Sequence, residues 1–131
     1  MRHVNCYSKK DEGGIAITKH FRVSEFACKD GEDTVFIDVE MVKILENIRT
    51  HFNKPVYVNS GYRTPSHNKA VGGAQYSYHK RGQAADIHIN GVKPSTIAAY
   101  ARQIMPYTGG IGIYADFVHI DTRAVKTTWN G

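Results

Sequence analysis

The chain has 131 residues, with 17 lysines and arginines against 12 aspartates and glutamates, so its formal charge is +5. This length allows one domain, and a hydrophobic content of 41% is enough to bury a core, which argues against a disordered chain. No apolar run approaches the roughly 20 residues that cross a bilayer, and no apolar stretch follows the charged N-terminus as in a secretory signal. We therefore expect a protein made in the cytoplasm, without a signal peptide and without membrane insertion.

The positive charge and the cysteines do not indicate a specialised class. No basic run is longer than two residues, which favours a solvated basic surface over a nucleic-acid partner. Cys6 and Cys28 form no Cys-x-x-Cys pair of the kind found in structural zinc sites or redox centres. We expect both to be free thiols.

The first half of the chain predicts helices around one strand. After a polar head, residues 20–31 (HFRVSEFACKDG) predict a short helix capped by Ser24. Residues 38–52 carry apolar side chains at spacings of three and four, which is typical of a helix. The segment VYVNS at 56–60 is typical of a strand, and Thr64 with the following proline begins another short helix.

The second half predicts a small sheet. In AADIHI (84–89) apolar residues alternate with Ala84, Asp86 and His88, so the strand has one core face and one polar face. An alanine-rich helix follows at 95–105, and strands at 110–114 and 117–121 are joined by a turn. This order predicts an α+β domain with a small, mainly antiparallel sheet and helices packed on one side.

Three of the seven histidines stand out because of their setting. His119 in FVHID lies on the strand face opposite its apolar neighbours, as Asp86 and His88 do on theirs, and such polar faces are costly to bury unless they are paired or bind a metal. His79, in a loop bounded by glycine, can supply a third imidazole. Zinc accepts such nitrogen and carboxylate ligands. The alternation leaves open whether Asp86 or His88 is the ligand, and His67 is expected to be solvated on its short helix.

The segment SYHKRGQAAD has the form Ser-x-His-x-x-Gly-x-Ala-x-Asp, preceded by SGYR and followed by a His-x-Asp strand. With these motifs the chain resembles the zinc D-Ala-D-Ala carboxypeptidase family, which includes L-alanyl-D-glutamate endolysins and vancomycin-resistance dipeptidases. The resemblance extends from about Phe21 to Arg123. It implies the hedgehog/DD-peptidase fold.

The resemblance also implies a role for each matching residue. The zinc ligands would be His79, Asp86 and His119, and His88 would then support the site from outside. Asp116 would be the general base in place of the glutamate of the endolysins, the alternative being an aspartate that only favours a tight turn. Arg63 would bind substrate and stabilise the oxyanion. Weaker candidates are Ser77 and Asn68 for substrate binding, and Asp121 for orienting a ligand imidazole.

The resulting hypothesis is a zinc-dependent peptidase that cleaves peptidoglycan stem peptides, as a D,D-carboxypeptidase or an L-alanyl-D-glutamate-type endopeptidase. We expect one monomeric catalytic domain over residues 1–131, with a polar head at 1–20 and a core at about 21–123. Phage or prophage origin is expected, with action on the cell wall after lysis or as part of a phage particle. The alternative is a catalytically silent zinc-binding domain of the same fold that binds a ligand or partner.

Overall fold

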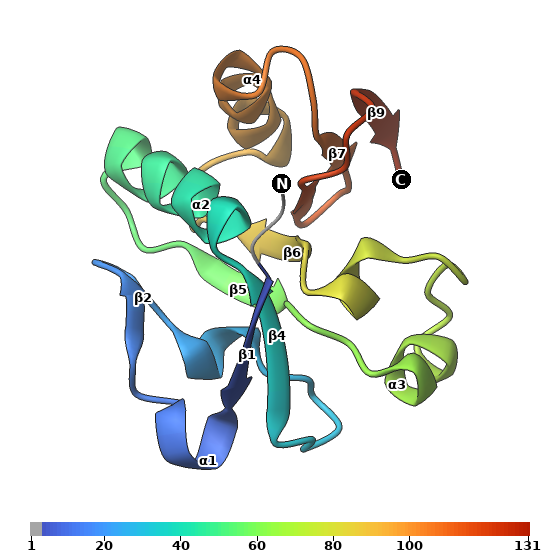
Figure 1. Cartoon of the computed structure of the whole chain (residues 1–131). Coiled ribbons are helices and arrows are strands. Elements are labelled where there is room, and N and C mark those ends of the chain that lie inside the picture. Colours follow the sequence, from blue (N-terminus) through green and yellow to red (C-terminus); the bar gives the residue numbers. More distant parts are fainter. Residues whose placement is uncertain (1–3) are drawn as a thin grey trace.

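Five strands form the central sheet, in the order β5–β6–β8–β7–β9. The computed structural model describes residues 4–131 (Figure 1). All neighbouring strands in this sheet are antiparallel except β7 and β9, which are parallel. The predicted α+β class and mainly antiparallel sheet are confirmed. The elements are β1 (Val4–Ser8), α1 (Lys9–Glu12), β2 (Ala16–Thr18), β3 (Phe21–Arg22), the 3-10 helix η1 (Val23–Phe26), β4 (Thr34–Asp38), α2 (Val39–Phe52), β5 (Tyr57–Ser60), α3 (Pro65–Ala70), the 3-10 helix η2 (Tyr78–Arg81), β6 (Ala84–His88), α4 (Pro94–Ile104), β7 (Gly110–Ile113), β8 (Val118–Asp121) and β9 (Thr127–Asn130).

The alternation along β6 and β8 divides the sheet into an apolar face and a polar face. Ile87 and Ile120 are fully buried and belong to the same core cluster as Leu45 of α2 and Ala101 of α4. Helix α4 packs on β7 and β8, and α2 packs beside α4. The two long helices therefore cover the apolar face, and the polar face is left for a site. No helix within residues 4–131 has the length and apolar character needed to cross a bilayer.

Three strand pairings were not predicted from the sequence, and one predicted helix differs in the structure. Strand β1 lies in the polar head and pairs with β4, β2 pairs with β3, and β9 adds an edge to the central sheet beyond the predicted core. Residues 1–3 of the head lie outside the described residues. The predicted helix capped by Ser24 was wrong: the segment forms only the 3-10 helix η1, because the Arg22 backbone N–H donates to Glu25 and starts the turn before Ser24.

Candidate functional site

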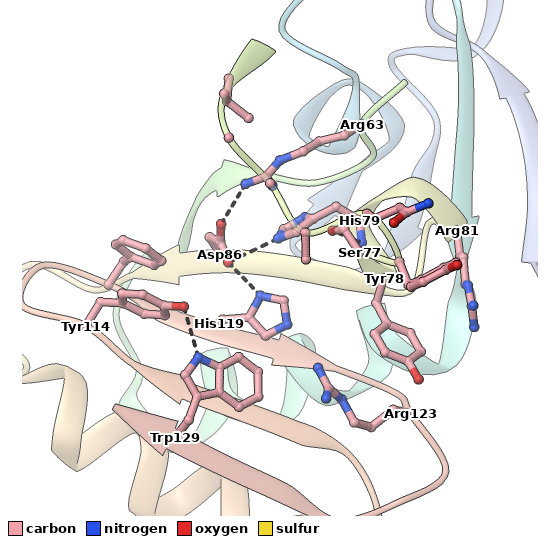
Figure 2. A pocket seen from close by; sticks show the side chains of 17 residues that line it. Arg63, Ser77, Tyr78, His79, Arg81, Asp86, Tyr114, His119, Arg123 and Trp129 are labelled. Carbon is pink, nitrogen blue, oxygen red and sulfur yellow. Dashed lines mark hydrogen bonds and ion pairs between the residues drawn. The ribbon is translucent and has the colours of Figure 1, made fainter. Parts of the chain in front are cut away.

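A cleft of about 630 Å³ lies over the polar face of the sheet (Figure 2). Asp86 of β6 and His119 of β8 lie directly opposite each other in the antiparallel register, and both line the cleft. His79 reaches the same point from η2, where Ser77 caps the turn by accepting the His79 backbone N–H. Residues from three elements therefore meet at one place.

His79, Asp86 and His119 form a compact, buried cluster. The Asp86 Oδ1 atom lies 3.3 Å from His79 Nε2 and 2.9 Å from His119 Nδ1. One ligand atom from each residue lies within 4.8 Å of the other two, and all three residues are buried. The structure thus brings together the three residues that the resemblance marked as ligands, and it places His88 outside the cluster.

The backbone fixes the tautomer of His79. Its Nδ1 atom lies 2.7 Å from the carbonyl oxygen of Gly61. A carbonyl can only accept, so Nδ1 must carry the proton, and the Nε2 lone pair of a neutral ring points at the carboxylate oxygen of Asp86. Two acceptors facing each other repel unless a cation lies between them. This is the arrangement expected of a metal-binding histidine with a backbone acceptor behind it.

His119 is held in a similar way by a side chain. Its Nε2 atom lies 2.8 Å from Asp121 Oδ2, while Nδ1 faces Asp86. Asp121 is fully buried and is held by Arg123, whose Nε and Nη2 atoms donate to its two carboxylate oxygens at 2.9 and 2.6 Å. The predicted proximity of Asp121 to His119 is therefore present in the structure.

Hydrogen bonds keep the carboxylates of this site charged. Burial by itself would raise the pKa of Asp86, but the interactions of its carboxylate with His119 and His79 outweigh burial and hold this pKa well below its usual range. Burial would also raise the pKa of Asp121, and hydrogen bonds from His119 and Arg123 lower it. For His119, burial opposes the charged form, yet its bonds to Asp121 and Asp86 raise its pKa.

Arg63 lies beside Asp86 with its guanidinium fixed on three sides. Its Nη2 donates to Asp86 Oδ2 at 3.3 Å, its Nη1 to Asn68 Oδ1 at 3.2 Å and its Nε to Ser60 Oγ at 3.1 Å. A guanidinium has five N–H donors, so two remain beyond these three bonds. Arg63 lines the cleft, where those two donors can serve a substrate.

The remaining predicted residues lie at different distances from the cluster. Ser77 lines the cleft. Asn68 is buried behind Arg63 and donates to the Ala74 carbonyl. His88 pairs with Asn59 and stacks on the ring of Tyr57, away from the three clustered residues. Asp116 is exposed in the turn between β7 and β8 and is not among the residues that line the cleft.

Two residues at the site, Trp129 and Arg123, were not predicted from the sequence. Trp129 of β9 lines the cleft, donates from Nε1 to the Tyr114 hydroxyl at 2.9 Å and lies 5.2 Å from the His119 ring, centroid to centroid (Figure 2). The tryptophan ring fits because its neighbour on β7 is Gly112, where a Cβ atom would come within 2.6 Å of the ring. Arg123 lies 4.7 Å from the Tyr78 ring centroid. The single tryptophan of the chain was the available signal.

The donor set of the cluster suits zinc. Two imidazole nitrogens and one carboxylate oxygen are the common ligands of a catalytic zinc ion, which keeps a further position open. Each imidazole has an acceptor on its other nitrogen, Gly61 O for His79 and Asp121 for His119. Such outer partners fix the ligating nitrogen and strengthen it as a donor. The three residues therefore fit a resident metal ion.

Comparisons with known proteins agree with this geometry. Residues 19–121 match the model of the family described as peptidase M15. The peptidoglycan L,D-endopeptidase MepK of Escherichia coli (strain K12) is 43% identical over 80 residues, which cover 56% of this chain and 43% of that protein. The probable peptidoglycan L,D-endopeptidase MepK of Haemophilus influenzae is 33% identical over 105 residues, covering 72% of this chain and 55% of that protein. The chain spans about half the length of these relatives. It belongs to the peptidase M15 family.

Proposed function

We propose that the chain is a zinc-dependent endopeptidase that cleaves peptidoglycan peptides at an L,D bond. The observation that carries the proposal is the cluster of His79, Asp86 and His119 on the floor of a cleft. The L,D-endopeptidase activity for which both relatives are named supports an L,D bond over the D,D-carboxypeptidase reaction that the sequence also suggested. The L-alanyl-D-glutamate bond is itself an L,D bond and is among the candidates.

The proposed metal ligands are His79 Nε2, Asp86 and His119 Nδ1. A zinc ion held there would polarise the scissile carbonyl and acidify water. Gly61 and Asp121 hold the two imidazoles with the correct nitrogen exposed. Arg63 neutralises the outer oxygen of Asp86 and offers its two remaining donors to the oxyanion as the carbonyl is attacked. Asn68 acts through Arg63 by holding its guanidinium in place.

Asp116 is the proposed general base, which would accept a proton from the attacking water. The turn required for this role is present, since the Tyr114 backbone N–H donates to the Phe117 carbonyl and closes the bend that carries Asp116. The side chains of Tyr114 and Phe117 stack on each other and line the cleft. Asp116 lies between them in sequence and is exposed.

Charge in the cleft supports an anionic substrate. Arg63, Arg81 and Arg123 all line it. Arg123 is paired with Asp121, whereas Arg81 is exposed and stacks over the Tyr78 ring at 4.9 Å. Peptidoglycan stem peptides carry free carboxylates, and a guanidinium binds a carboxylate through two parallel hydrogen bonds. We assign Arg81 to the recognition of such a carboxylate.

The test is digestion of purified peptidoglycan by the zinc-loaded protein, with the released fragments identified by mass. We expect fragments that end at an L,D bond, and we expect none from Asp86→Asn, which keeps the size of the side chain but removes its charge. Fragments from any other bond would contradict the specificity, and equal cleavage by Asp86→Asn would contradict the metal centre. Action on the wall after lysis or within a phage particle stays a prediction.

A catalytically silent zinc domain is the second candidate, favoured by the exposed position of Asp116 outside the cleft lining. Such a domain would bind one zinc ion and retain peptidoglycan fragments without cleaving them. Intact fragments recovered from the zinc-loaded wild type would support it over the enzyme.

A further inference from the structure

A second group of side chains that could hold a metal ion lies outside the cleft. Cys28, Asp30 and His67 each offer one ligand atom, and these atoms lie within 4.8 Å of one another. Cys28 and Asp30 come from the loop after η1, and His67 comes from α3. None of the three lines the cleft. The fold therefore brings together donors that are distant in the sequence.

The three donors differ in burial in a way that suits an ion bound at the surface. Cys28 is buried, His67 is half-buried and Asp30 is exposed. The sulfur is close to main-chain and side-chain groups of Thr64, 3.5 Å from its N and 4.0 Å from its Oγ1. Within the described residues, the His67 ring has no hydrogen-bond partner, so its lone pair is available to a ligand.

Thr64 holds the Asp30 carboxylate in place. Its Oγ1 donates to Asp30 Oδ2 at 2.6 Å, and the Glu32 backbone N–H donates to Oδ1 at 3.0 Å. The carboxylate is charged, and each oxygen retains a lone pair for a cation.

The chemistry of the donors selects a class of ion. Thiolate and imidazole prefer zinc and neighbouring transition metals, whereas magnesium and calcium prefer oxygen alone. A thiolate and a carboxylate together balance the charge of a divalent ion, and the neutral imidazole adds none. We propose that Cys28, Asp30 and His67 form a second metal site, which binds a zinc-class divalent ion.

An ion at this site would connect two segments that now meet through hydrogen bonds. It would tie the loop at 28–30 to α3. The same helix carries Asn68, next to His67, and Asn68 holds Arg63. We therefore assign the second ion a structural role, that of fixing α3 and the arginine that α3 supports.

Cobalt distinguishes the two sites because only one contains sulfur. A thiolate bound to Co²⁺ gives an intense charge-transfer absorption in the near ultraviolet, and the cluster of His79, Asp86 and His119 has no thiolate. Titration of the reduced wild-type protein with Co²⁺ is expected to reach two ions per chain, with this absorption present. Cys28→Ser is expected to lose the absorption and keep one ion. Cys6→Ser is the matched control, because Cys6 is exposed on β1 and should not affect either value.

His67→Gln provides a second variant that leaves the buried thiol intact. We expect the Co²⁺ affinity of this site, measured from the charge-transfer absorption, to fall at least tenfold. Circular dichroism should show an unchanged fold. Asp86→Asn is expected to keep the absorption and lose the other ion. A wild type that binds one ion without the absorption would overturn the proposal, as would an absorption that persists in Cys28→Ser or disappears in Cys6→Ser. Peptidoglycan cleavage is not measured, so an inactive protein leaves this test intact.

Discussion

The two faces of β6 and β8 use the same strands for opposite purposes. On one face Ile87 and Ile120 are fully buried under the long helices. On the other face Asp86 and His119 are also buried, but against each other and against charged partners in the lining of a cleft. Adjacent residues in the chain therefore serve stability and chemistry separately. The apolar face needs volume to be filled, and the polar face needs each nitrogen and oxygen to have a defined partner.

The separate roles of the two faces can be tested by comparing effects on activity, zinc affinity and stability. These effects share one free-energy scale, since a tenfold change in a rate or an equilibrium constant is about 1.4 kcal/mol. The largest expected effect concerns the polar side. Asp116→Asn should lower kcat/KM on a stem-peptide substrate by roughly 10²- to 10⁴-fold, because a general base contributes about that much. Zinc content should not change. Asp11→Asn, an exposed aspartate on α1, is the control and should retain full activity. Full activity in Asp116→Asn would exclude it as the base.

The next effect concerns the apolar face. Ile87→Ala should lower the free energy of unfolding by about 2–5 kcal/mol because it leaves a cavity in the core. Ile87→Val should cost about 0.5–1.5 kcal/mol. Denaturant unfolding measures both values. Zinc content and activity per folded molecule should match the wild type, and a loss of zinc from folded Ile87→Val would show that the two faces are not separable.

A smaller effect is expected from the support of His119. In Asp121→Asn the amide can present an N–H to His119 Nε2, which would move the ring proton to Nδ1 and block the ligating nitrogen. We expect zinc affinity to fall by roughly 10- to 100-fold, as for other outer partners of metal-binding histidines. Competition with a chromophoric chelator measures this affinity. An unchanged value would mean that Asp121 does not orient the ring.

The smallest effect on zinc binding is expected from a residue away from both faces, and this variant calibrates the others. Asp38 caps α2 by accepting the Glu40 backbone N–H, and its second oxygen accepts from the Thr122 hydroxyl at 2.6 Å. Loss of the helix cap alone should lower stability by about 0.5–2 kcal/mol in Asp38→Ala. The buried Thr122 hydroxyl, left without its acceptor, adds to that loss. Asp38→Asn, which can still cap, should recover part of that loss in thermal unfolding. A larger effect on zinc affinity than on stability would contradict this assignment.

Local patterns in the sequence predicted those parts of the fold that local rules determine. The spacing of apolar residues gave α2, and alternation gave β6 and β8 with the correct faces. Strand β9 could not be predicted in the same way, since its pairing with β7 is parallel and depends on the path of the chain between them. The same limit applies to β1, which is exposed along much of its length and pairs with a strand far along the chain.

The residues of the site likewise fall into those that local patterns predict and those that only the folded chain brings together. Alternation put Asp86 and His88 on one face without choosing between them, and the cross-strand register made the choice by setting Asp86 opposite His119. The role of Arg123 was not predictable, because an arginine two residues after an aspartate is usually solvated. Only the folded chain shows that Asp121 is buried and that Arg123 closes the site behind it.

The two histidines of the cluster differ in mutational robustness. His119 depends on the Asp121 side chain, so a single replacement can remove its partner. His79 depends on a peptide carbonyl, which every amino acid at position 61 would supply. Yet position 61 tolerates no larger residue, since a Cβ atom there would lie 2.7 Å from the Phe26 Cα. A mutation can therefore disturb His119 by changing the chemistry of the Asp121 side chain. A mutation at position 61 can disturb His79 only by steric conflict, because the carbonyl partner itself is kept.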